Sequence, residues 1–241
     1  VIGQYDQVYL DGIAYPTIAP SKNIAIKNCR IYGFDQSGVL ADYVDYFSVN
    51  DCHIYNCCRD GVRTYGVEQF NISDNTIHDI FPGFAGTGTA PNLNAYGVAC
   101  TRVYKSGNND GTLAPFRDTA YGIVDNNKVR QVPTWKGLDS HGGEYITFSN
   151  NVVKGTYVGI GLAQGGDASD TGISSPSHII VSGNILRQDP NNRSLDGVDY
   201  GNSNAIQVFS NNNTVDTCSI DILITGNNAK GWGFDGGRGV I

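Results

Sequence analysis

A short pattern that recurs along the chain constrains its fold more than any other feature. In this pattern an apolar residue precedes two small or polar residues, then Asn or Cys, then an apolar residue two positions further on. The Asn or Cys positions form a column made of Cys29, Cys52, Asn75, Asn127, Asn151, Asn184 and Asn227. Successive members lie 23, 23, 52, 24, 33 and 43 residues apart, so the basic unit has about 23 residues and the longer intervals contain insertions. Such a period predicts a solenoid.

Each unit also contains a second short segment that begins with Gly. These segments start at Gly38, Gly61, Gly97, Gly137 and Gly159. Two or three short strands per unit, without a helical period, predict coils of strands that stack parallel on one another. We expect the Asn column at turns, because Asn tolerates the left-handed conformation and stacked Asn side chains can hydrogen-bond along the axis. A β-sandwich would instead show Asn-Gly or Asp-Gly turns at shorter spacing. The sequence therefore predicts an all-β parallel solenoid.

From roughly residue 23 to 230, the stacked Asn pattern resembles the pectin-lyase-like superfamily. The resemblance implies a single-stranded right-handed parallel β-helix with long loops over one face. It also implies a polysaccharide lyase or epimerase, or a phage tailspike, with a homotrimer expected from the tailspike analogy alone. We expect one β-helix domain over residues 1–241, as a fragment or mature piece of a longer chain, because the sequence has no Met.

Composition narrows the partners and the location. The formal net charge is −7 and no basic run occurs, which argues against nucleic acid as a partner. No apolar stretch approaches the ~18 residues of a membrane span. The 31 Gly and 14 Tyr residues are typical of a turn-rich extracellular β-protein, secreted or part of a phage virion. We expect the six Cys residues to be buried thiols. No metal site or cofactor is expected, with a bound Ca²⁺ left open.

The stretch "GLDSHGG" supplies the main candidates for chemistry. Aligning the Gly-led segments places Leu40, Arg63, Ala99, Asp139 and Gly161 in one column, and Asp42, Tyr65, Thr101, His141 and Ala163 two residues further on. The core column is Val39, Val62, Val98, Leu138 and Ile160. Because side chains alternate along a strand, Asp139 and His141 should share the outward face. Arg63 and Tyr65 should lie two coils away, on the order of 10 Å.

Asp139 and His141 also resemble, over a few residues, the Asp-Pro-His motif of mannuronan epimerases, with Ser140 in place of Pro. The resemblance implies a proton-transfer role for the His. Gly161 and Ala163 occupy the next outward positions, where the sequence offers no second His.

The residue types support that chemistry without the resemblance. A His exchanges a proton near neutral pH, and an Asp two residues away can raise its pKa or fix its tautomer. Removing the C5 proton of a uronate requires a neutralised carboxylate, for which Arg63, Arg102 or Lys136 are candidates, and Tyr65 is the candidate for a second proton-transfer group. We thus predict Asp139, His141, Tyr65 and Arg63 as catalytic residues. The predicted substrate-binding residues are Arg102, Thr101, Lys136, Trp135, Tyr96, Tyr157 and Gln207.

Two other functions stay open. A glycoside hydrolase needs paired carboxylates, and Asp139 has candidate partners in Asp167, Asp170, Asp196 and Asp199. A non-catalytic glycan-binding or structural spike would use the same groove without chemistry. Long insertions at residues 81–94, 105–118, 164–177 and 188–203 are expected to wall the outward face. Aromatic residues near their ends would serve as exposed platforms for sugar rings.

Overall fold

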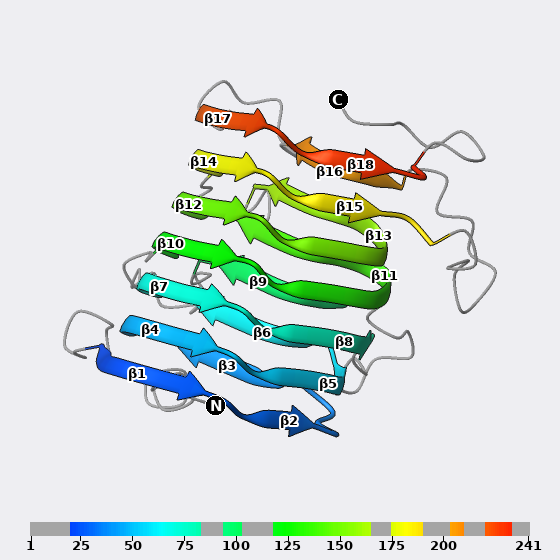
Figure 1. The fold of residues 1–241 in the computed structure, drawn as a ribbon. Helices are drawn as coiled ribbons and strands as arrows, with labels where there is room; N and C mark the ends of the chain where they lie inside the picture. The colour runs from blue at the N-terminus through cyan, green and yellow to red at the C-terminus, as the bar shows by residue number, and fades with distance from the viewer. Residues whose placement is uncertain are drawn as a thin grey trace, which may run out of the picture.

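The computed structural model describes residues 20–82, 94–102, 118–164, 175–189, 203–209 and 220–232, and every regular element in them is a β-strand. Successive coils pair only through parallel strands, as Figure 1 shows for the stack from β1 to β17. The predicted parallel β-helix is confirmed. The long insertions fall mostly outside the described residues.

The strands form three faces around the coil. The first face contains β1 (Ser21–Lys27), β4 (Val44–Asn50), β7 (Glu68–Ser73), β10 (Ala120–Asp125), β12 (Glu144–Ser149), β14 (Ser177–Ser182) and β17 (Ile220–Thr225). The second contains β2 (Arg30–Tyr32), β5 (His53–Cys58), β8 (Thr76–Phe81), the first halves of β11 (Lys128–His141) and β13 (Val152–Ala163), β15 (Ile185–Arg187) and β18 (Asn228–Lys230). The third contains β3 (Val39–Asp42), β6 (Asp60–Tyr65), β9 (Tyr96–Thr101), the second halves of β11 and β13, and β16 (Asn204–Phe209).

The core of the coil is an apolar column from each face. On the third face the predicted core residues Val39, Val62, Val98, Leu138 and Ile160 are all buried. They lie in register on successive strands. Since this column is internal, the residues that alternate with it point away from the core.

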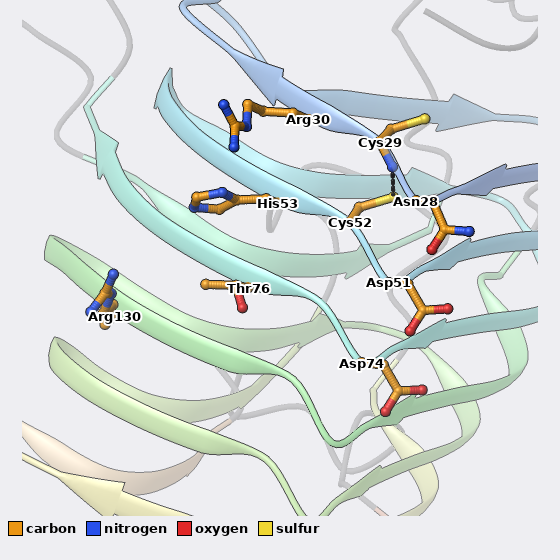
Figure 2. Close-up of a pocket in the computed structure, with 9 residues that line it drawn as sticks. All are labelled: Asn28, Cys29, Arg30, Asp51, Cys52, His53, Asp74, Thr76 and Arg130. Atoms are coloured by element: carbon orange, nitrogen blue, oxygen red, sulfur yellow. Dashed lines mark hydrogen bonds between the residues drawn. The ribbon is translucent and has the colours of Figure 1, made fainter.

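The turn between the first and second faces contains the Asn column. From Cys52 to Asn184, the backbone N–H of each member donates to the side-chain oxygen of the next, as Asn127 does to Asn151 Oδ1 (2.9 Å) and Asn151 to Asn184 Oδ1 (2.9 Å). The amide nitrogens also donate along the axis, with Asn151 Nδ2 reaching Asn184 Oδ1 at 3.0 Å. The predicted Asn ladder is confirmed, and at its N-terminal end Cys29 N–H donates to Cys52 Sγ at 3.5 Å (Figure 2).

Two details differ from the prediction. The left-handed conformation belongs to the residue before each column member, such as Asp74 (φ 61°) and Asn150 (φ 54°), because the column residue must turn its side chain inward. Cys29 is exposed, whereas Cys52, Cys57 and Cys100 are buried. The exposed thiol lies on the outermost described coil, where its Sγ contacts the Lys27 carbonyl oxygen.

Replacing Asn151 by Ala should lower the free energy of unfolding by about 3 kcal/mol, because buried groups of Asn127, Asn184 and Val124 lose their partners. Chemical denaturation measures this change. Asn71→Ala on the exposed outside of β7 is the control and should change the free energy by less than about 0.5 kcal/mol. Equal effects of the two substitutions would contradict the ladder's role.

Candidate functional site

The outward side chains of the third face form a regular lattice. The registered strands place Asp60, Tyr96, Lys136, Val158 and Asn204 in a first row, Leu40, Arg63, Ala99, Asp139, Gly161 and Gln207 in a second, and Asp42, Tyr65, Thr101, His141 and Ala163 in a third. The second and third rows are the columns predicted from the aligned Gly residues, which are therefore confirmed.

Lys136, Asp139 and His141 of β11 form the centre of this lattice. Lys136 Nζ donates to Asp139 Oδ1 at 2.6 Å, and His141 Nδ1 is hydrogen-bonded to Asp139 Oδ2. Lys136 and Asp139 are completely buried, while 20% of the His141 side chain is exposed. The prediction that Asp139 and His141 share a face is confirmed. Asp139 is covered, however, and only His141 reaches the surface.

Burial and neighbouring charges together determine the protonation states of Asp139 and His141. Burial raises the pKa of Asp139, but His141 and Lys136 outweigh it and hold that pKa below its usual range. Burial lowers the pKa of His141, against the opposing effect of Asp139, and Lys136 and Arg63 lower it further. Near neutral pH the imidazole is thus neutral. Because an ionised Asp139 can only accept, Nδ1 carries the proton and Nε2 presents a lone pair.

Arg63 and Tyr65 form a second polar group on β6. Arg63 Nη2 bonds Asp60 Oδ1 at 2.7 Å, and Nη1 donates to the Tyr65 hydroxyl at 2.7 Å. Burial disfavours the charged guanidinium, yet Asp60, Tyr65 and Tyr96 raise the pKa of Arg63 well above its usual value. Arg63 is therefore a fixed positive charge, only 7% exposed.

Tyr96 connects the two groups. The Arg63 guanidinium lies 4.8 Å from the centre of the Tyr96 ring, and that ring meets His141 edge-on at 6.0 Å. At 5% exposure Tyr96 is buried and does not form the exposed sugar platform expected from the sequence. Strand β9 separates β6 from β11, so Arg63 and His141 are two coils apart, about 10 Å.

The other predicted binding residues surround this centre. Thr101 lies between Tyr65 and His141 in the third row, and its buried Oγ1 has no hydrogen-bond partner among the described residues. Arg102 is also buried, and its backbone N–H donates to the His141 carbonyl oxygen at 3.2 Å. Trp135 and Tyr157 stack at 5.7 Å at the bend before the third face, both partly exposed. Gln207, half-buried, lies two coils beyond Asp139.

Lys136 differs most from expectation. The sequence offers it as a cation for substrate, but the structure places its ammonium group on Asp139, beneath the surface. Gly161 makes this possible, since a Cβ there would lie 2.5 Å from Lys136 Cδ and 3.0 Å from Asp139 Oδ1. The absence of a side chain at Gly161 therefore provides the space in which Lys136 holds Asp139.

Asp60 is a residue of the candidate site that sequence reasoning missed. It precedes Arg63 by three positions, as Lys136 precedes Asp139, and each forms an ion pair on the same side of the sheet. A Cβ at Gly61 or Gly137 would meet the core side chains of Ile77 and Val153, so the residue before each Gly points outward. Aligning that position across the coils would have revealed this first row.

An open pocket of about 610 Å³ lies away from this site, on the second face. Arg30, His53, Thr76 and Arg130 line one side, and Asn28, Asp51 and Asp74 line the other, at the turn (Figure 2). Across the described part of the chain, no group of 3 or more His, Cys, Asp or Glu side chains is placed to hold a metal ion. Nor does this part contain a helix able to span a membrane.

Comparison with known proteins agrees with the fold. Residues 9–101 match the family described as right handed beta helix region, and the chain is a right-handed parallel β-helix as predicted. No curated protein sequence matches it. The mannuronan C-5 epimerase AlgE4 A-module of Azotobacter vinelandii is similar in structure at 13% identity and TM-score 0.49, over 91% of this chain and 58% of that one.

Two further solved structures are similar. A mutant tailspike protein of E. coli bacteriophage HK620, in complex with a pentasaccharide, has 13% identity and TM-score 0.44, over 86% of this chain and 35% of that one. An alginate lyase from Paenibacillus sp. has 10% identity and TM-score 0.34, over 92% of this chain and 79% of that one. The chain thus spans 58% of the epimerase module and 35% of the tailspike. At these identities the likeness concerns the fold alone.

The buried ammonium group of Lys136 should control the basicity of His141. In Lys136→Met, the pKa of His141 should rise, because a positive charge that lowers it is gone and Asp139 interacts with His141 alone. The variant should also lose about 3 kcal/mol of stability. Histidine ring signals followed by NMR against pH measure the pKa. Lys154→Met, at an exposed position of β13, should leave it unchanged, and an unchanged or lower pKa in Lys136→Met would contradict the arrangement.

Proposed function

We propose that this chain is a carbohydrate-active protein, acting outside a cell or on a phage particle, that removes the C5 proton of a uronate in an acidic polysaccharide. The observation that supports this is the orientation of His141 by the buried Lys136 and Asp139. With Nδ1 bound to Asp139, Nε2 is the nitrogen left to accept a proton, on a side chain that is 20% exposed. The Asp-x-His resemblance agrees with this role.

The reaction that fits best is β-elimination. His141 Nε2 takes the C5 proton, the C5–H electron pair forms the C4–C5 double bond, and the C4–O4 bond breaks. The proton held by His141 then passes to the departing O4, so one group completes the cycle. Epimerisation would need a second proton donor on the opposite side of the sugar. Among the described residues beside His141 in its row, Thr101 and Ala163 do not provide one.

Arg63 and Tyr65 are assigned to binding. Two coils separate them from His141, which corresponds to about two sugar rings. Tyr65 is thus too distant to exchange a proton with the carbon that reacts at His141. Arg63, whose guanidinium lies over the Tyr96 ring, is the cation assigned to a substrate carboxylate.

A glycoside hydrolase is less compatible with the described strands. Such an enzyme needs a protonated carboxyl group, but the surroundings of Asp139 favour its carboxylate form. Asp60 is in turn paired with Arg63. Asp167, Asp170, Asp196 and Asp199 lie outside the described residues.

Replacing His141 by Ala should lower kcat/KM on a polyuronate by about 10²- to 10⁴-fold, because the proton acceptor is lost. The ultraviolet absorbance of the unsaturated uronate, recorded beside a reducing-end assay, measures the activity. His178→Ala is the control, since His178 is exposed on the first face beside Asp221, and it should retain full activity. Reducing ends without absorbance would indicate a hydrolase. Neither signal on any acidic glycan would indicate an epimerase or a binding spike, and each of these outcomes contradicts the proposed elimination.

The pH dependence of kcat/KM should reveal the lowered pKa of His141. Burial favours the neutral imidazole, so the base form persists below the ordinary value of 6.5. Activity should therefore decline only as pH falls through a midpoint below 6.5, where the ring gains a proton. An acid limb centred above 6.5 would show that another group is the base.

A further inference from the structure

The second face presents two outward rows of side chains along the stack. The first consists of Arg30, His53, Thr76, Lys128, Val152, Ile185 and Asn228. The second consists of Tyr32, Tyr55, His78, Arg130, Lys154, Arg187 and Lys230. No carboxylate occurs in either row, although the net charge of the chain is −7.

Four cations occupy consecutive positions of the second row, and we call Arg130, Lys154, Arg187 and Lys230 the basic stripe. They come from β11, β13, β15 and β18, which are neighbours at the right of Figure 1. Parallel pairing sets successive positions about 4.8 Å apart. Arg130, Lys154 and Lys230 are exposed and Arg187 is half-buried. The stripe is thus a straight line of charge parallel to the axis.

Within the described strands, no carboxylate neutralises the stripe. Among the described residues, none of its four cations forms an ion pair. Arg187 donates instead to neutral oxygens, those of the Leu186 and Asn228 carbonyls and of the Asn228 side chain. Like charges one coil apart repel each other, so the row is unfavourable without a counter-charge. An anionic polymer with one charge per coil would relieve that repulsion.

On the N-terminal coils the second row consists of aromatic rings instead of cations. Arg30 and His53 extend from adjacent strands on the side of Arg130 (Figure 2). In the second row, Tyr32 stacks on Tyr55 at 5.0 Å, and Tyr55 on His78 at 5.2 Å. Tyr55 is covered by Tyr32 on one side and His78 on the other, so Tyr32, 56% exposed, is the ring of this stack that stays open to bases. Asp51 and Asp74 lie across the pocket at the turn and limit the positive surface on that side.

We propose that the basic stripe binds a linear anionic polysaccharide with one carboxylate per sugar, laid parallel to the axis of the β-helix. The rise of one coil corresponds to about one sugar residue, so each cation meets the carboxylate of a successive sugar. This site lies on the second face and does not depend on the chemistry proposed for His141. A single-stranded nucleic acid fits less well, because it relies on stacking of bases on open aromatic faces.

The test measures binding of defined oligouronates by isothermal titration calorimetry, with His141→Ala as the parent to prevent turnover. Arg130→Gln/Lys154→Gln should weaken binding about tenfold and reduce its salt dependence, because two charge-assisted contacts are lost. Lys22→Gln/Lys27→Gln removes the same charge from the first face and should change the affinity less than about twofold. Melting temperatures verify that each variant is folded.

Several outcomes would overturn the proposal. They are equal losses for the two double variants, equal affinity for neutral dextran, and tighter binding of oligothymidylate than of oligouronate. The measurement also separates the two proposals. A wild-type protein without turnover whose binding still depends on Arg130 and Lys154 would refute the proposed reaction alone, and turnover with no effect of the stripe would refute only the present inference.

Discussion

The hydrogen bonds of the Asn column are the interaction on which the rest of the structure depends. Each buried Asn at the turn accepts the N–H of the preceding coil and donates to a carbonyl oxygen within the stack, as Asn151 does with Asn127 and Val124. A coil that slipped by one residue would lose these bonds and reverse the side chains of every following strand. The ladder therefore fixes the register that places Asp139 between Ala99 and Gly161, and His141 between Thr101 and Ala163.

The third face combines burial with charge in two similar ion pairs. Lys136 and Asp139 form one, and Asp60 and Arg63 form the other, with the order of the charges reversed. A buried ion pair adds little to stability, since desolvation offsets most of its Coulomb energy. Its effect here is on orientation and protonation. The ionised Asp139 fixes the tautomer of His141, and Lys136 keeps that imidazole from becoming too basic.

Much of the fold and part of the site follow from the sequence, because parallel stacking converts a repeat spacing directly into a register. The columns through Asp139 and His141 are found from the leading Gly residues alone. The exposure of these side chains cannot be found in this way. Alternation along a strand shows which side a residue points to, but not which other groups cover it. Lys136 can reach Asp139 only because the residue beside Asp139 on the next coil is Gly161, which has no side chain. The cations of the basic stripe are 24, 33 and 43 residues apart, so no basic run appears in the sequence.

The coil also acts as a unit of length. Arg63 and His141 are separated by whole coils, and each coil advances the stack by about one sugar residue of an extended glycan. Insertion or deletion of one complete coil between them would leave each local structure intact. In the proposed reaction, it would move Arg63 to a different sugar relative to the reacting carbon. The number of coils, as much as the identity of any side chain, would then determine which pattern of substituents along a polymer the surface accepts. Gain and loss of coils is thus a route by which such a protein can change specificity in steps of one monomer.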